Sequence, residues 1–258
     1  MATKIRFLKK PVLNEPVLLT GLPGIGLVGK ISVDYLLKQF KGEKIAELTS
    51  DSFPPSVHTF DAQIELIKDE LHYCKIGKKD FLFLAGPVQP SLDFHAGSAQ
   101  EHYEFAQAIV DAVAPLGVKQ IFTLAGINIG EQRMVKEPEI VAAATSKKLL
   151  ADLKKIGATT QKQDGLISGA AGLILGIAKD KGIEGACLMG ETNASLVYGD
   201  HGAAKKLIEF LVKLFGFSVK MEEIEKESKN IERAFTQLAK QFEQEEDKPP
   251  ESGLSYVR

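Results

Sequence analysis

A glycine-rich segment near the N-terminus has the residue types and spacing of a phosphate-binding turn. Gly24, Gly26 and Gly29 spell G-x-G-x-x-G between an apolar run and a helical pattern. In dinucleotide-binding proteins this motif brings a pyrophosphate against backbone N–H groups at the start of a helix. Glu47, at the end of the next predicted strand, lies near the position of a ribose-binding acid. One hypothesis for this segment is therefore nucleotide binding.

A second hypothesis gives the same glycines a structural role. Gly21, Leu22 and Pro23 separate the motif from the preceding strand, whereas the dinucleotide motif begins where the strand ends. The glycines would then allow a helix to pack closely on a sheet. A lone short motif is weak evidence for a ligand, so the sequence favours this structural role. Under either hypothesis the residues concerned are Gly21, Pro23, Gly24, Gly26, Gly29 and Lys30.

The sequence contains no pattern that predicts catalysis or metal binding. The histidines lack the H-x-x-x-H and H-E-x-x-H spacings of zinc enzymes, and the chain lacks the G-x-S-x-G motif of serine hydrolases. Cys74 and Cys187 lie in apolar strand patterns, and we expect both to be inert core thiols. Residues 190–193 follow a strand, where open α/β sheets bind ligands, but no partner base accompanies them. We therefore expect no enzyme, no metal and no cofactor.

Alternating apolar runs and helical patterns must position these residues. Buried strands are predicted at residues 17–19, 44–48, 81–85, 120–125 and 185–189. Helices are predicted at residues 27–40, 98–114, 145–156, 171–179 and 203–215. Residues 56–77 are typical of a β-hairpin or edge strands. This alternation predicts a three-layer α/β/α sandwich with a largely parallel central sheet over residues 1–220.

The composition is that of a globular protein. The chain has 258 residues, of which 44% are hydrophobic and 26% charged, and this is enough to bury a large core. A net charge of −2 argues against a generally basic nucleic-acid footprint. The sequence shows neither a signal core nor an apolar run long enough for a membrane span. We therefore expect a cytoplasmic protein that binds neither nucleic acid nor membranes.

The charge pattern changes near residue 220. Residues 221–247 contain nine acidic and four basic side chains. Apolar residues recur there at spacings of three, four and seven, and Ser228 is the one polar interruption. These apolar residues include Ile224, Ile231, Phe235, Leu238 and Phe242. The pattern predicts an amphipathic helix that either docks on its own domain or joins two protomers. Residues 248–258 follow as a flexible spacer with an apolar, aromatic tip, which is typical of a tethered binding peptide.

Several segments resemble the proteasome assembly chaperone family. Residues 21–37 (GLPGIGLVGKISVDYLL) resemble its opening signature, and residues 167–176 and 185–192 its later helix and strand. Asp200 and the helix after it fit the last core helix of the family, so the resemblance covers about residues 10–215. It implies an α/β/α sandwich without established catalysis, homo-oligomers in archaeal relatives, and binding to the α-subunits of the proteasome core particle.

The same resemblance implies a role for the C-terminal tail. Some relatives end in a hydrophobic residue, a tyrosine and any third residue, and this tripeptide inserts between α-subunits. Here Tyr256 is third from the end, and Val257 stands where that tyrosine would be. The implied function is a non-enzymatic chaperone or adaptor that binds α-subunits through a homo-oligomeric surface and its tail. The alternative is a nucleotide- or nucleoside-binding enzyme that uses the glycine-rich segment. The tail residues concerned are Leu254, Tyr256, Val257 and Arg258.

Overall fold

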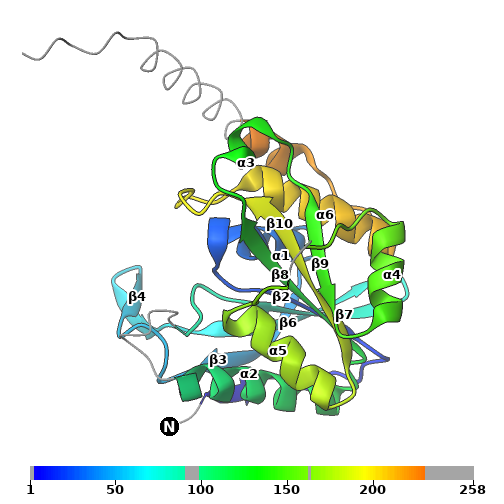
Figure 1. Ribbon diagram of the computed structural model, residues 1–258. Helices are drawn as coiled ribbons and strands as arrows, with labels where there is room; N and C mark the ends of the chain where they lie inside the picture. Colours follow the sequence, from blue (N-terminus) through cyan, green and yellow to red (C-terminus); the bar gives the residue numbers. More distant parts are fainter. Residues whose placement is uncertain (1–2, 91–98, 162–163, 230–258) are drawn as a thin grey trace, which may run out of the picture.

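A central sheet covered by helices on both faces forms the body of the molecule (Figure 1). The computed structural model describes residues 3–90, 99–161 and 164–229. The sheet has eight strands in the order β1-β3-β6-β7-β2-β8-β10-β9. This arrangement confirms the predicted three-layer α/β/α sandwich.

The sheet is parallel at its centre and antiparallel towards both edges. Its strands are β1 (Lys4–Phe7), β2 (Val17–Gly21), β3 (Glu43–Thr49), β6 (Asp69–Ile76), β7 (Lys79–Ala85), β8 (Gln120–Asn128), β9 (Ile140–Ala144) and β10 (Glu184–Thr192). Strand β2 pairs in parallel with β7 and β8, and β8 pairs in parallel with β10. The central strands are almost entirely buried, since helices cover both faces of the sheet, and this explains their continuous apolar runs.

All five predicted strands are present, and the structure adds two that the sequence did not predict. Strand β1 has only four residues with alternating exposure, and β9 consists mostly of small residues. Residues 56–77 contain the expected hairpin, formed by β4 (Val57–Phe60) and β5 (Gln63–Leu66). The same segment also supplies β6, which lies inside the main sheet between β3 and β7 and is not an edge strand.

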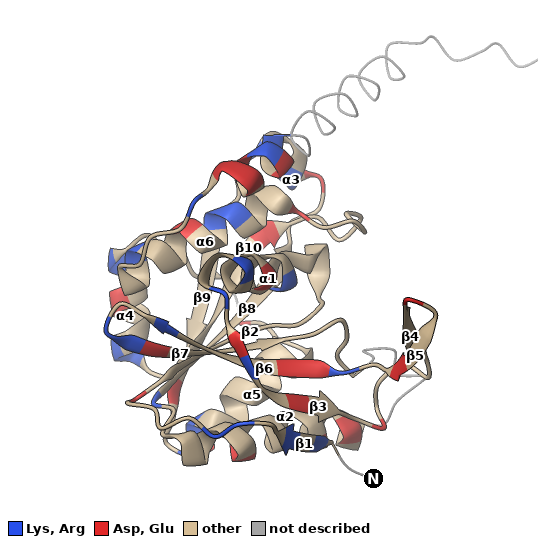
Figure 2. Cartoon of the chain, turned by 180° about the vertical axis from the view of Figure 1, so that it is seen from behind, with Lys and Arg blue, Asp and Glu red and all other residues tan. Residues whose placement is uncertain are grey.

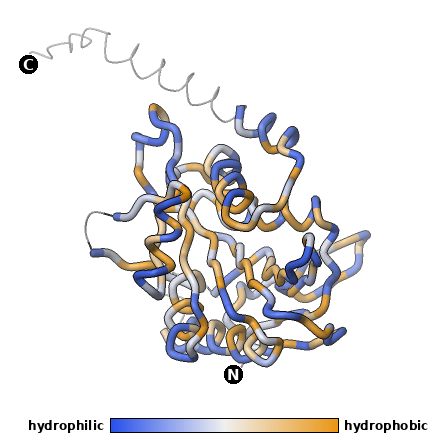
Figure 3. Tube along the Cα trace, turned by 90° about the vertical axis from the view of Figure 1, so that its right-hand side faces the viewer, coloured by the Kyte–Doolittle hydropathy of each residue, from blue (hydrophilic) through white to orange (hydrophobic). Residues whose placement is uncertain are grey.

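Two helical layers enclose the sheet, and all five predicted helices are present. The helices are α1 (Val28–Phe40), α2 (Ala99–Val113), α3 (Gln132–Val135), α4 (Lys147–Lys155), α5 (Gly169–Asp180) and α6 (His201–Phe215). Helices α1, α4 and α6 pack on one face of the sheet, and α2 and α5 pack on the other. Figure 3 shows the hydrophobic segments running through the interior of the body, with hydrophilic segments in many outer loops.

The start of the C-terminal helix docks on the folded domain. Residues 222–229 are helical, and Ile224 is buried in the same core as α1 and α6. An ion pair between Lys38 and Glu223, 2.6 Å long, also joins α1 to this helix. Four residues of the predicted helical face lie outside the described residues: Ile231, Phe235, Leu238 and Phe242. The tail also lies outside them, with Leu254, Tyr256, Val257 and Arg258. The first turns of the helix therefore belong to the core of the domain.

Candidate functional site

The glycine-rich turn lies at the carboxyl ends of the central parallel strands. Strand β2 ends at Gly21, and a short 3₁₀ turn, Ile25–Leu27, leads into α1. Gly26 has a φ of 59°, and Leu27 follows with a φ of 49°. This left-handed backbone is strained for most residues, and glycine adopts it without a steric penalty. The turn therefore favours a glycine at position 26, where a Cβ would also lie 2.4 Å from the Thr192 hydroxyl oxygen.

Close packing explains two further glycines of the motif. A Cβ on Gly21 would lie 2.2 Å from the Gly29 carbonyl oxygen, and a Cβ on Gly29 would lie 2.0 Å from the Leu124 carbonyl oxygen. A Cβ on Gly24, by contrast, would meet no atom within 4 Å. The turn thus brings α1 against the backbone of β8, which is the structural role that the sequence favoured.

The acid predicted to bind ribose lies elsewhere. Strand β3, which carries Glu47, is separated from β2 by β6 and β7, so this part of the nucleotide hypothesis is wrong. Hydrogen bonds from Arg6 and then Lys44 lower the pKa of Glu47 to about 2. Lys30, the last residue of the turn motif, forms an ion pair with Asp34 at 2.6 Å. Both charged groups are therefore engaged within the fold.

A buried ion pair fixes the elements around the turn. Asp200 is fully buried and accepts hydrogen bonds from Arg133 Nε at 2.8 Å and Arg133 Nη2 at 3.0 Å. The same carboxylate accepts a hydrogen bond from the Thr192 hydroxyl and caps the N-terminus of α6 at the Ala203 N–H. The backbone N–H of Asp200 donates to the Gly26 carbonyl oxygen. Asp200 therefore joins α3, β10 and α6 through its carboxylate and the glycine turn through its backbone N–H.

Ser228, the polar residue on the C-terminal helical face, lies beside the ion pair of Arg133 and Asp200. A Cβ on Gly202 would lie 2.5 Å from Arg133 Nη2 and 3.3 Å from Ser228 Oγ. Ser228 is buried, so its hydroxyl replaces an apolar side chain where the helix covers polar groups. The interruption at Ser228 is thus a packing feature, which the spacing of apolar residues alone did not explain.

Both cysteines lie in the core, where the sequence placed them. Cys74 and Cys187 are buried, and burial raises the pKa of each thiol to about 11, which confirms the prediction of inert core thiols. Among the described residues, no three His, Cys, Asp or Glu side chains are grouped so that they could hold a metal ion. In the same part of the chain, no helix is both long and apolar enough to span a bilayer. In the view of Figure 2, basic and acidic residues are interspersed along the helices and strands.

A second buried carboxylate, Asp69, begins β6 beneath the loop that follows β7. Its oxygen Oδ1 occupies the space where a side chain on Gly86 would stand. Neither carboxylate oxygen has a hydrogen-bond partner of good geometry among the described residues. Burial raises the pKa of Asp69 well above its ordinary value of 3.8, and the backbone N–H of Val88 offsets this increase only in part. The folded protein therefore favours the protonated acid.

This raised pKa predicts a pH-dependent stability. The unfolded chain loses the Asp69 proton near pH 3.8, whereas the folded protein keeps it to a higher pH, so this group makes stability fall as the pH rises between the two values. Asp69→Asn removes the ionisation while keeping the shape. We expect the melting temperature of the variant, relative to wild type, to be higher at pH 8 than at pH 4.5. A difference that is the same at both pH values would contradict this prediction.

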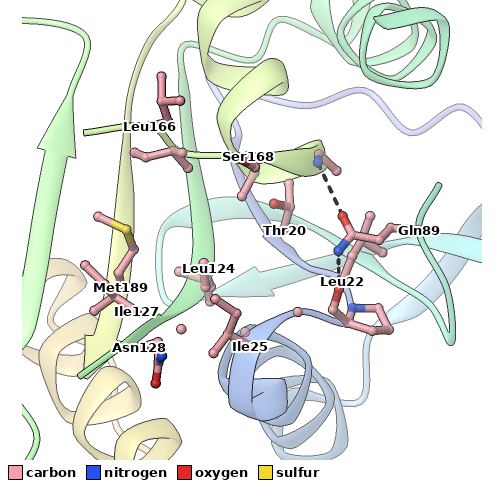
Figure 4. Close-up of a pocket in the computed structure, with 18 of the residues that line it drawn as sticks. Thr20, Leu22, Ile25, Gln89, Leu124, Ile127, Asn128, Leu166, Ser168 and Met189 are labelled. Atoms are coloured by element: carbon pink, nitrogen blue, oxygen red, sulfur yellow. Dashed lines mark hydrogen bonds between the residues drawn. The ribbon is translucent and has the colours of Figure 1, made fainter. Parts of the chain in front are cut away.

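A cavity of about 220 Å³ lies between the glycine turn and the start of α5 (Figure 4). The ends of β2 and β8 form its floor, and its lining includes Thr20, Ile25, Leu166 and Ser168. Gln89 connects two of its walls, since its Nε2 donates to the Pro23 carbonyl oxygen and its Oε1 accepts from the Ala170 N–H. Its position at the carboxyl edge of parallel strands is the usual place for a ligand in open α/β sheets.

Comparisons with known proteins give consistent relationships over nearly the whole chain. The model of the PAC2 family matches residues 18–239. The uncharacterized protein MJ1210 of Methanocaldococcus jannaschii is 36% identical over 252 residues, which cover 95% of this chain and 93% of that protein.

Solved structures show the same relationship. PbaB of Pyrococcus furiosus, described as an archaeal proteasome activator, has a TM-score of 0.83 and 30% identity and covers 92% of this chain and 99% of its own. PbaA of Pyrococcus furiosus, described as an archaeal homolog of proteasome-assembly chaperone, has a TM-score of 0.72 and 23% identity, with 95% of each chain covered. At that identity the likeness to PbaA shows the fold alone.

Proposed function

Because this chain belongs to the PAC2 family, we propose that it is a non-enzymatic proteasome chaperone or activator that binds the α-subunits of the core particle. The observation that carries the proposal is the likeness to PbaB, which extends over 92% of the chain at a TM-score of 0.83. The geometry at the end of β10 agrees with it, since the polar groups there hold the fold together. The Thr192 hydroxyl and the Arg133 guanidinium, for example, both donate hydrogen bonds to Asp200.

The nucleotide alternative receives little support from the geometry. A Cβ on Gly24, the first glycine of the motif, would meet no atom within 4 Å, and Glu47 lies three strands away from β2. The cavity of about 220 Å³ is also below the roughly 300–1,000 Å³ that is usual for drug-sized ligands. A dinucleotide is larger than such a ligand, so the cavity does not support the dinucleotide form of this alternative.

Self-association forms part of the proposed mechanism. The β4–β5 hairpin extends away from the body (Figure 1) and exposes four large apolar side chains, each between 47% and 72% accessible. These side chains are Val57, Phe60, Ile64 and Leu66. Exposed apolar groups of this kind are typical of contact surfaces. In an oligomer several C-terminal tails can bind several α-subunits, and avidity then strengthens a contact that is weak in a single peptide.

The tail can be tested separately from the folded domain. Deleting residues 254–258 should weaken binding to α-subunit rings by about tenfold or more, because it removes the aromatic Tyr256 and the apolar Leu254 and Val257 beside it. Tyr256→Ala should reproduce most of this loss, and the melting temperature should be unchanged in both variants. Biolayer interferometry against immobilised α-subunit rings measures the effect, with Ser255→Ala as the matched control. Equal binding by the truncated and full-length chains would place recognition on the folded surface.

A further inference from the structure

Thr20 brings a hydroxyl group to the cavity beside the glycine turn. Thr20 is only 3% exposed, lines the cavity, and makes no hydrogen bond through its hydroxyl within the described part of the chain. The hydroxyl points into the cavity (Figure 4). A hydroxyl that no protein group satisfies is usually met by water or a ligand. Thr20 therefore marks the cavity as a place where a polar atom binds.

The start of α5 supplies a second polar feature on the same cavity. Ser168 precedes the helix with an extended backbone, and its side chain makes no capping hydrogen bond. The first turn of a helix of this length carries partial positive charge and favours an anion. Among the described residues that line the cavity there is no Asp or Glu, so none of them would repel a negative group. The same described residues include no Lys or Arg, so they offer no counter-charge to a strongly charged ligand such as a polyphosphate.

The remaining walls and the volume limit the size and nature of the ligand. Most of the lining is apolar and includes Leu124, Ile127, Leu166 and Met189. A cavity of about 150 Å³ lined by such residues accommodates benzene. The volume here, about 220 Å³, therefore suits one ring or branched chain with a small polar head group. Leu166 and Ile25 are 96% and 44% exposed and could cover the bound ligand.

We propose that this cavity binds a small organic monocarboxylate with a compact apolar body. The carboxylate accepts a hydrogen bond from Thr20 and lies towards the N-terminus of α5, and the apolar body fills the space between β8, β10 and Leu166. Gln89 is a positioning residue, because its two hydrogen bonds hold the glycine turn and α5 at a fixed separation. This inference is independent of proteasome binding.

Isothermal titration calorimetry on the full chain tests the proposal with phenylacetate as the probe and phenylacetamide as its neutral counterpart. We expect phenylacetate to bind at least tenfold more tightly than phenylacetamide. Thr20→Val should weaken phenylacetate binding at least fivefold, Thr20→Ser should retain it, and Ala171→Phe should abolish it by filling the cavity. Thr123→Val is the matched control, since Thr123 is a buried threonine of β8 that does not line the cavity.

The melting temperature of each variant separates loss of binding from loss of folding. Retained affinity in Thr20→Ser and Thr123→Val, with loss in Thr20→Val and Ala171→Phe, supports the assignment. The proposal is overturned if phenylacetate does not bind, if phenylacetamide binds equally well, or if folded Thr20→Val and Ala171→Phe variants bind like wild type.

Discussion

The Gly29→Ala variant should lose about 3 kcal/mol of its free energy of unfolding, because the added methyl group would stand 2.0 Å from the Leu124 carbonyl oxygen. That oxygen belongs to the backbone of β8, a central strand, so it cannot rotate away as a side chain would. Helix α1 must move off the sheet instead, and the core between them opens. Urea denaturation, extrapolated linearly to water, measures the loss.

Gly24→Ala is the matched control within the same motif. Gly24 has an extended backbone with a φ of −159°, and a Cβ there would meet no atom within 4 Å. We therefore expect a change of less than about 0.5 kcal/mol. In a dinucleotide motif the first glycine is required for the tight turn and the third for close packing of the helix on the strand. Gly24→Ala is therefore the variant that separates the two explanations, because a loss at Gly29 is expected in both. A large loss in Gly24→Ala, or none in Gly29→Ala, would disprove the packing explanation.

The glycine turn shows what the sequence can and cannot predict about a site. The motif and its place between a strand and a helix were correctly predicted, because glycine spacing and apolar runs are local patterns. The reason for Gly29 was not accessible, because its neighbour Leu124 is distant in sequence and becomes adjacent only when β8 pairs with β2. Thr20 was not singled out from the sequence, since it follows the predicted strand at residues 17–19 and no local pattern marks a hydroxyl that faces a cavity.

The Asp200→Ala variant should also be strongly destabilised, by about 3–5 kcal/mol, the usual cost of removing one partner from a buried ion pair. The change removes both hydrogen bonds from Arg133, the bond from Thr192 and the cap on α6. Differential scanning calorimetry and urea denaturation report the loss. The double variant Arg133→Met with Asp200→Ala should recover part of it, because the buried guanidinium is removed together with its carboxylate.

An exposed ion pair provides the control for this cycle. Lys38 and Glu223 have side chains that are 66% and 62% exposed, so Lys38→Ala should change stability by no more than about 1 kcal/mol. If Asp200→Ala cost no more than Lys38→Ala, the buried ion pair would not hold the turn, α3 and α6 together as the structure indicates.

Arg133 was not predicted from the sequence, and the reason is physical. It lies in a helix of only four residues, too short to show a periodic pattern, and its partner is 67 positions away in the sequence. Asp200 was noted only for its fit to a family segment, although an aspartate before an apolar helical run is a standard helix cap. The main helices and central strands were predicted well because their apolar spacing reflects the layer that each one contacts.

Native mass spectrometry of the full chain mixed with α-subunit rings of the cognate proteasome tests the proposed function most directly. The free chain gives the mass of its own oligomer, and the rings give theirs. The proposal predicts a new species whose mass is the sum of one ring and one or more whole oligomers. It also predicts that this species is lost when excess core particle is added as a competitor for the chain. Spectra that contain only the two separate masses, at concentrations where both assemblies remain intact, would contradict it.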